Sequence, residues 1–474
     1  MGRQLWVLLL LATLGLVLLL HFPARLAAQP STAGGPTEIR GVWITANDMG
    51  VMRDRERMRQ TVAQLAELNF NTLYPVVWNS GFAYYPSRVS EDRGLQTFTY
   101  RGLQGQDILA ELIETAHSHG LLVVPWFEFG FMTPPDSLLA RRHPGWLTRT
   151  QDGGLTSISA AGKVSWLNPF RPEVQELITD LVLEIMGQYD ADGIQFDDHM
   201  SLPRDFGYDP FTLALYEKET RKPNSKAPST ASAPPTPQDP AWLKWRADKI
   251  TAFMGQLRKA VEARRPGAIF SVSPNYYDFA YKLQLQDWLT WVRRDIADEI
   301  LIQIYRPDVE SFLPHLSRVE VQETLQKIPT GIGIMSGQRT RPAPMDLIQS
   351  QVLAARERQL GVAFFYLESL WEQSGEPREA RLEGLRQLFP TPAPRQRRAR
   401  SSPLSQPAAP ASLPNQPGTP PPVTPVPGTA GPGNALPARP LPLPPPLPSL
   451  PGAFAPHAAP PQPTAAFSAV LQEA

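Results

Sequence analysis

Residues 172–199 read PEVQELITDLVLEIMGQYDADGIQFDDH, and this stretch contains one complete unit of the pattern that decides the fold. Leu177 and Leu181 belong to an apolar face at helical spacing, which predicts a helix over 172–189 with proline in its first turn, where the missing amide costs nothing. The apolar and aromatic run that follows predicts a strand over 193–197.

The same alternation of short apolar runs and amphipathic stretches occurs eight times between Glu38 and Phe389. The predicted strands cover 39–45, 72–78, 121–127, 193–197, 269–274, 300–305, 330–335 and 362–367. The predicted helices cover 54–68, 107–119, 172–189, 240–265, 287–298, 309–326, 344–360 and 378–388. Eight such units in one domain predict an α/β protein with a closed parallel (β/α)8 TIM barrel. No G-x-G-x-x-G turn follows the first strand, which argues against a doubly wound dinucleotide-binding sheet.

The pattern divides the chain into four segments. They are a signal peptide or membrane anchor over 1–28, a linker over 29–37, the barrel over 38–390 and a proline-rich disordered tail over 391–474. An apolar run from Leu5 to Leu20 follows Arg3, as in an export signal. Arg25 and Leu26 stand where cleavage requires small residues, so an uncleaved anchor remains open. We therefore expect the barrel outside the cytoplasm: periplasmic, secreted or anchored.

Two further segments are expected to lie outside the barrel's core. Residues 221–239 are rich in Pro, Ser, Thr and Ala, which predicts a surface excursion before the fourth helix. The tail holds many of the 53 prolines and cannot bury a core. It fits either a stiff spacer toward a partner that the sequence does not identify or an inert extension.

Composition limits the classes of ligand. Lys plus Arg number 45 and Asp plus Glu number 45, so no excess charge points to nucleic acid, and a polysaccharide fits better. Cysteine is absent, which excludes disulfides, thiolate metal sites and cysteine nucleophiles. We expect no cofactor, and contact with a membrane only through the N-terminal segment.

Carboxylates follow the predicted strands at their C-terminal ends, where TIM barrels carry their reactive groups. They are Asp48, Glu128, Asp197 with Asp198, Asp278 and Glu368. Side chains alternate along a strand, so Asp197 shares its face with polar Gln195 and is expected at the barrel mouth.

Glycosidic bond hydrolysis uses two carboxyl groups, one that protonates the leaving oxygen and one that attacks the sugar or activates water. Asp197 is the predicted nucleophile, and Asp198 is placed in the same catalytic group. Glu368 and Glu128 are the candidate acids, because the aromatic residues before each of them are expected to raise its pKa. Loop capping or ion pairing is the structural alternative for all four.

Aromatic residues are predicted to line the rim and to stack on sugar rings, although each one taken singly fits a core position better. They are Trp43, Tyr74, Trp78, Trp126, Tyr276, Tyr277, Tyr305 and Trp371. The polar residues expected to contact substrate are Asp48, Gln195, His199, Asn275 and Gln303, with turn chemistry as the alternative for Asp48 and for Asp278.

His199 after two aspartates also suggests a metal site. We expect none, because adjacent residues of an extended segment point in different directions and no second histidine stands at the i, i+4 ligand spacing.

The sequence resembles the glycosyl hydrolase-like 10 family over nearly all of residues 38–389. The resemblance rests on Glu38-Ile39-Arg40-Gly41-Val42-Trp43, Trp166-Leu167-Asn168-Pro169, Asp192 to His199, and Gln303-Ile304-Tyr305. It implies a barrel behind an export signal, an active site at Asp197 and Asp198, and hydrolysis of an envelope glycan such as peptidoglycan strands stripped of peptides. A wider likeness to α-amylase-like barrels implies that Asp197 is the nucleophile. Glu128 departs from the family pattern, in which Trp-Phe-Asn is common after the third strand.

Two other functions remain open on the sequence. A glycan-binding scaffold would keep the cleft but lack a competent acid. A metal-dependent deacetylase or esterase would bring Asp197, Asp198 and His199 to one point.

Overall fold

A computed structural model describes residues 38–95, 106–159, 162–221, 234–338 and 341–395. The predicted signal or anchor, the linker, most of the surface excursion and most of the tail lie outside these residues. Within the described part of the chain, no helix is long and apolar enough to cross a bilayer.

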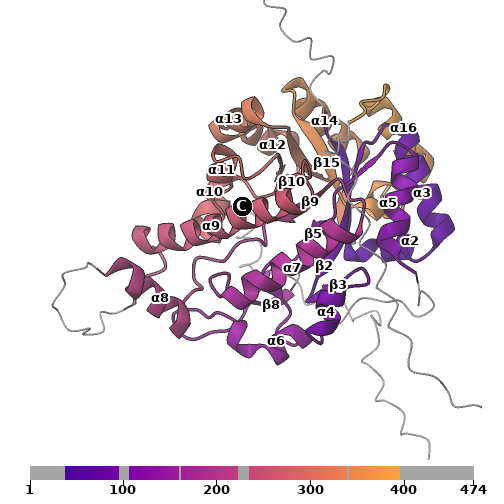
Figure 1. Ribbon diagram of the computed structural model, residues 1–474. Coiled ribbons are helices and arrows are strands. Elements are labelled where there is room, and N and C mark those ends of the chain that lie inside the picture. Colours follow the sequence, from indigo (N-terminus) through magenta and orange to yellow (C-terminus); the bar gives the residue numbers. More distant parts are fainter. Residues whose placement is uncertain (1–37, 96–105, 160–161, 222–233, 339–340, 396–474) are drawn as a thin grey trace, which may run out of the picture. The chain divides into compact units, whose positions relative to one another are not determined.

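Eight parallel strand positions close into a barrel, as predicted (Figure 1). The strands are β1 (Arg40–Ile44), β2 (Thr72–Asn79), β4 (Leu122–Val123) continued by β5 (Trp126–Phe127), β9 (Gly193–Asp197), β10 (Ile269–Ser273), β11 (Glu299–Gln303), β12 (Thr330–Met335) and β15 (Gly361–Phe365). Each strand pairs with the next along the chain, and β1 pairs with both β2 and β15, which closes the ring.

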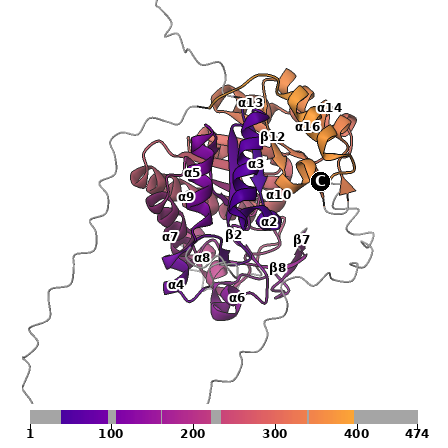
Figure 2. The same ribbon diagram turned by 90° about the vertical axis from the view of Figure 1, so that its right-hand side faces the viewer.

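Helices cover the outside of the barrel (Figure 2). The main ones are α3 (Arg55–Glu67), α5 (Ile108–Ser118), α7 (Pro172–Gln188), α9 (Pro240–Arg264), α11 (Trp288–Arg293), α12 (Val309–Leu316), α13 (Val319–Lys327), α14 (Met345–Glu357) and α16 (Arg378–Leu388). The single helix predicted over 309–326 is wrong, because Ser317 and Arg318 separate α12 from α13. Pro314, which offers no backbone N–H, lies in the last turn of α12.

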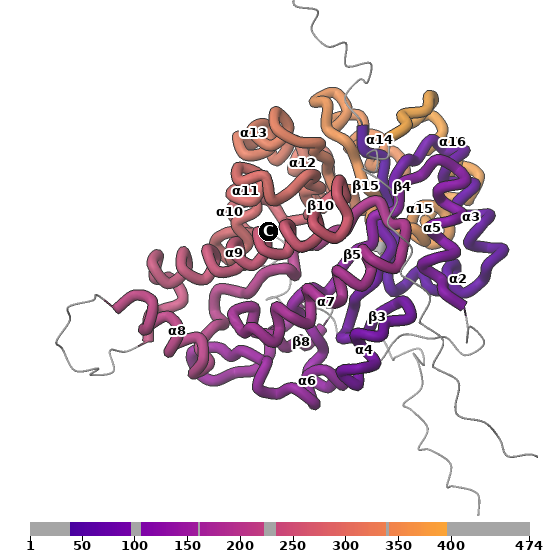
Figure 3. Tube along the Cα trace, viewed as in Figure 1, coloured from indigo at the N-terminus to yellow at the C-terminus, as the bar shows by residue number. Residues whose placement is uncertain are grey.

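Short elements that the sequence pattern missed extend the loops at the barrel mouth. They are η1 (Ala46–Asp48), α2 (Met49–Met52), β3 (Phe82–Ala83), α4 (Arg88–Asp92), β6 (Met132–Thr133), α6 (Leu138–Arg142), η2 (Pro144–Trp146), β7 (Ser157–Ser159), β8 (Gly162–Trp166), α8 (Pro210–Thr220), α10 (Tyr277–Gln284), β13 (Gly337–Gln338), β14 (Arg341–Pro342) and α15 (Leu367–Trp371). β6, β7 and β8 form a small antiparallel sheet after the third barrel strand. Figure 3 shows α8 leading away from the barrel and α9 returning to it.

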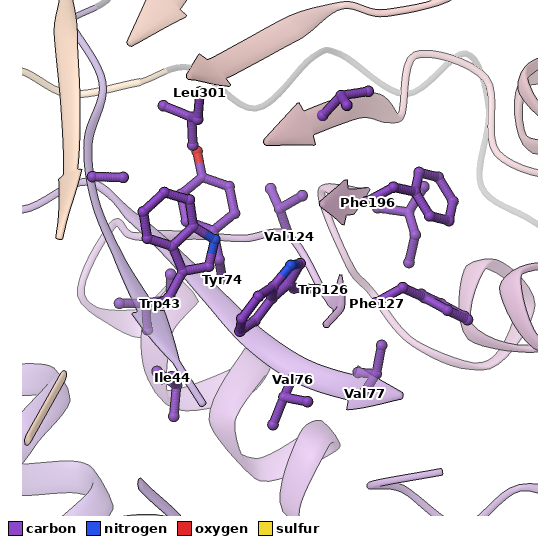
Figure 4. Packing of buried hydrophobic residues seen from close by; sticks show 14 of the residues in the cluster. Trp43, Ile44, Tyr74, Val76, Val77, Val124, Trp126, Phe127, Phe196 and Leu301 are labelled. Atoms are coloured by element: carbon purple, nitrogen blue, oxygen red, sulfur yellow. The ribbon is translucent and has the colours of Figure 1, made fainter. Parts of the chain in front are cut away.

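Large rings fill the inside of the barrel. In Figure 4 the rings of Trp43, Tyr74 and Trp126 lie together, whereas Phe127 and Phe196 project away from them. Room for Trp43 comes from Gly333, where an added Cβ would lie 3.4 Å from the indole. The barrel interior is therefore a packed core and not a channel.

The last described residues pack against the bottom of the barrel. The side chain of Asn71 donates to the backbone oxygens of both Glu38 (2.7 Å) and Ala393 (2.8 Å). Arg395 is buried. Residues 391–395, which the sequence analysis assigned to the start of the tail, thus make hydrogen bonds with the barrel.

Candidate active site

The inward face of β9 points into the barrel, as the alternation of its side chains predicts. Gln195 accepts a hydrogen bond from Trp43 Nε1 (2.7 Å) and donates one to Ser271 Oγ (2.9 Å). Asp197 follows two residues later on the same face, at the C-terminal end of the strand. This places its carboxylate directly above the layer that contains Gln195.

Asp197 and His199 form a buried pair. Asp197 Oδ1 accepts from the backbone N–H of His199 at 2.9 Å, and its Oδ2 lies 3.1 Å from His199 Nδ1. Asp197 is 3% exposed. Burial raises the pKa of the Asp197 carboxyl to about 7, while the charge and hydrogen bonds of His199 act in the opposite direction.

His199 is held by a second contact. Its Nδ1 lies 2.8 Å from the backbone oxygen of Glu128. Because a carbonyl oxygen only accepts, Nδ1 must carry a proton. Burial by itself lowers the pKa of His199, but the negative charges of Asp198 and Asp197 raise it to about 10. The neighbouring aspartates therefore favour the protonated, imidazolium form of the ring.

Asp198 begins the loop and turns toward the neighbouring strands. Its Oδ2 accepts from Asn275 Nδ2 at 2.8 Å, and its Oδ1 accepts from Gln303 Nε2 at 3.3 Å. Its side chain keeps 21% exposure. Asn275 and Gln303, which were predicted to contact substrate, thus orient a carboxylate.

Burial and the charges of Asp198 and Asp197 raise the pKa of Tyr305 well above its ordinary value. The Tyr305 hydroxyl therefore keeps its proton and can donate a hydrogen bond.

Glu128 lies at the same end of the adjacent strand. Trp126 pairs with Gln195 in register, and Glu128 and Asp197 each follow their paired residue by two positions. The Glu128 carboxylate accepts from Asn79 Nδ2 at 2.6 Å. Burial raises the pKa of Glu128, and the hydrogen bonds from Asn79 and from the backbone N–H of Ala46 offset that effect only partly.

Glu368 and Asp48 lie in a different environment. Glu368 Oε2 accepts from Gln373 at 2.6 Å, and a Cβ on Gly50 would lie 3.6 Å from its Oε1, so the carboxylate points toward α2. Asp48 is fully buried, and its oxygens accept from the backbone N–H groups of Thr45 (2.6 Å) and Glu368 (2.8 Å). Substrate contact by Asp48 is therefore wrong, and turn chemistry explains it.

The predicted aromatic rim is wrong for the indoles. Trp43, Trp78, Trp126 and Trp371 are each at most 3% exposed and belong to the hydrophobic core. Tyr305 remains only partly buried. The indole of Trp43 lies inside the barrel because Gly333 on β12 leaves room for it, whereas Trp371 belongs to α15 and not to a barrel strand.

A basic and aromatic cluster beside the mouth escaped the sequence analysis. The guanidinium groups of Arg306 and Arg318 each lie 5.7 Å from the centre of the Tyr276 ring. Arg306 Nη2 donates to His315 Nε2 at 2.9 Å. Burial and the two guanidinium groups lower the pKa of His315 to about 4. The one sequence feature that could have indicated this cluster is Arg306, which directly follows Tyr305.

Asp278 forms ion pairs with Arg318 and Lys282, as a structural residue does.

The acidic residues and His199 meet the geometric condition for a metal site. Three possible ligand atoms, one each from Asp197, Asp198 and His199, all lie within 4.8 Å of one another. The hydrogen bonding nevertheless differs from that of a metal ligand, because Nδ1 of His199, the nitrogen that faces Asp197, carries the proton donated to the Glu128 backbone oxygen and offers no lone pair to a metal. We interpret the cluster as an ion pair.

Comparison with known proteins gives one family. The sequence model of the family described as glycosyl hydrolase-like 10 matches residues 38–354, a span that ends before β15. Glycosyl hydrolase DigH of Escherichia coli strain K12 is 24% identical over 326 residues, which cover 60% of this chain and 69% of DigH.

Two solved structures support the same architecture. The glycoside hydrolase domain of PgaB (BpsB) from Bordetella bronchiseptica superimposes with a TM-score of 0.55 at 15% identity, over 74% of this chain and 99% of that domain. The catalytic domain of β-amylase from Paenibacillus polymyxa gives a TM-score of 0.52 at 10% identity, over 75% of this chain and 99% of that domain. At these identities the likeness concerns the fold alone.

Proposed function

Because this chain belongs to the glycosyl hydrolase-like 10 family, we propose that it is an extracytoplasmic glycoside hydrolase that cleaves a cell-envelope glycan. The observation that carries the proposal is that Glu128 and Asp197 each lie two residues beyond the register pair Trp126–Gln195, at the same end of adjacent strands. The apolar run near the N-terminus, which lies outside the described residues, supports the location.

The two carboxyl groups suit different tasks. Glu128, whose pKa is raised by burial, retains its proton to higher pH than an ordinary glutamate and is the proposed general acid for the leaving oxygen. Asp197 lies against the imidazolium of His199 and is the proposed nucleophile or base. Its oxygen either attacks the anomeric carbon or removes a proton from the attacking water.

Asp198 completes the proposed centre. Asn275 and Gln303 hold its carboxylate beside Asp197, and it remains the more exposed of the two. We assign it the stabilisation of the positive charge that develops on the sugar in the transition state. Tyr305, kept protonated by the two aspartates, would donate a hydrogen bond to a sugar hydroxyl.

The basic cluster supports an acidic glycan as substrate. Arg306 and Arg318 flank Tyr276 next to Asn275, which holds Asp198. Arg318 is already paired with Asp278 and Glu320, so Arg306 is the proposed partner for an acidic sugar. Guanidinium groups pair with carboxylates, and an aromatic ring stacks on the apolar face of a sugar. Peptidoglycan strands that have lost their peptides offer a carboxylate on each muramic acid, which matches this arrangement.

The test is digestion of purified glycans by the full-length protein. Peptidoglycan with and without its peptides, and an uncharged polysaccharide, would be incubated with the wild type and with Asp197→Asn, Asp198→Asn and the control Asp92→Asn, whose side chain is exposed on α4. We expect mass spectrometry to detect fragments from stripped peptidoglycan with the wild type and the control only. Equal release by Asp197→Asn would exclude the proposed nucleophile, and binding without release would favour the glycan-binding scaffold.

A further inference from the structure

A continuous chain of hydrogen bonds runs through the buried interior of the barrel. It starts at Glu299, the first residue of β11, which is fully buried. Glu299 Oε1 accepts from Tyr74 (2.8 Å) and from Ser271 (2.7 Å). Ser271 accepts from Gln195 (2.9 Å), and Gln195 accepts from Trp43 (2.7 Å). The side chains immediately beneath Asp197 are thus oriented by one carboxylate.

The positive charge that balances this carboxylate comes from Arg395, which is 96 residues further along the chain. Arg395 Nη2 lies 2.5 Å from Glu299 Oε2, and its Nη1 donates to Thr72 Oγ1 at 2.9 Å. Arg395 follows α16 and lies beyond the span that the family match covers. The bond from Asn71 to the backbone of Ala393 holds the segment that delivers it.

A buried carboxylate without a partner is costly, because the protein interior solvates charge poorly. Removing Arg395 would therefore disturb Glu299 and every hydrogen bond that depends on it. We infer that Arg395 is a positioning residue for the proposed active site, acting through Glu299, Ser271 and Gln195 on the floor beneath Asp197. The role in catalysis rests on the proposed function; the role in orienting the floor does not.

The experiment is a double-mutant cycle in the full-length protein with Arg395→Met, Glu299→Gln and the combined variant. Each single change leaves one buried charge unpaired, so we expect the melting temperature to fall by roughly 5 °C or more. The amide oxygen introduced by Glu299→Gln can still accept from Tyr74 and Ser271, so the combined variant should recover most of this loss. Arg386→Met, whose side chain is exposed on α16, is the matched control and should behave as wild type.

Two measurements distinguish a positioning role of Arg395 from a purely structural role in folding. For Arg395→Met we expect kcat to fall by about tenfold with little change in KM, and the near-ultraviolet circular dichroism from Trp43 to change, with Trp43→Phe identifying that signal. Both should recover in the combined variant. The inference is overturned if Arg395→Met lowers stability while kcat and the Trp43 signal stay unchanged, or if the combined variant is no better than the single ones. If the wild type cleaves no glycan, the proposed function fails, and the Trp43 signal alone decides the inference.

Discussion

The imidazole Nδ1 of His199 lies 2.8 Å from the backbone oxygen of Glu128, so one ring joins the ends of the third and fourth barrel strands. The same nitrogen lies 3.1 Å from the carboxylate of Asp197. The backbone of the proposed acid and the carboxylate of the proposed nucleophile therefore contact one shared side chain, and a disturbance at His199 should reach both strand ends.

Replacement of Glu128 should affect substrates according to their leaving group. Glu128→Gln removes the proposed proton donor, so we expect kcat/KM on a natural glycan to fall by roughly 10²–10⁴-fold. An aryl glycoside with an acidic phenol needs little protonation and should lose much less. Because the pKa of Glu128 is raised, wild-type activity should decline as pH rises through that value, and the variant should lack this decline. Equal losses on both substrates would argue against an acid role.

Replacement of Glu368 should matter far less. Its carboxylate accepts from Gln373 and points toward α2, so Glu368→Gln should lower kcat by less than about tenfold. Steady-state kinetics on the same glycan, beside Glu128→Gln, measure the contrast. A loss as large as that of Glu128→Gln would restore Glu368 as the acid.

Replacement of His199 should move the acidic limb of the pH profile. Without the imidazolium, the pKa of Asp197 rises above about 7, and a nucleophile or base must be ionised to act. Activity of His199→Gln should therefore begin only at higher pH than in the wild type, which a plot of kcat/KM against pH would reveal. An unshifted limb would separate His199 from the ionisation of Asp197.

The same residue should make stability depend on pH. The pKa of His199 is raised from 6.5 in the unfolded chain to about 10, so its contribution is complete below pH 6.5 and is lost as pH rises through 10. Thermal unfolding should show the wild type losing its advantage over His199→Gln between neutral and alkaline pH. A constant difference between the two proteins over that range would contradict the assignment.

Gly130 should tolerate no side chain. It has φ +49°, and an added Cβ would lie 2.5 Å from the backbone oxygen of His199. Gly130→Ala should cost roughly 1–3 kcal/mol of unfolding free energy and also lower activity, because the loop that holds His199 must shift. Gly120→Ala is the matched control, with φ +75° and open space around the added Cβ. Urea unfolding that gives equal losses for the two variants would mean that only backbone strain matters.

The barrel follows from local properties of the sequence. Helical and strand periodicity depend on residues a few positions apart, so 193–197 and 172–189 could be recognised without any tertiary information. The inward direction of Asp197 follows from the same alternation. Elements of two to five residues, such as β6 and α6, carry too few repeats to be distinguished from loops.

The site depended on contacts between distant segments. Nothing in the residues next to them decides between Glu128 and Glu368. Only packing places the Glu128 carboxylate against Asn79 and that of Glu368 against Gln373. The indole of Trp43, predicted for the rim, lies inside the barrel because Gly333 on a distant strand leaves space that this ring fills. Sequence alone thus determined the barrel and the strand that delivers Asp197, since both are periodic. Tertiary structure decided the partners of each charge, including Arg395 with Glu299, because burial and electrostatic pairing are set by residues that meet only after the chain has folded.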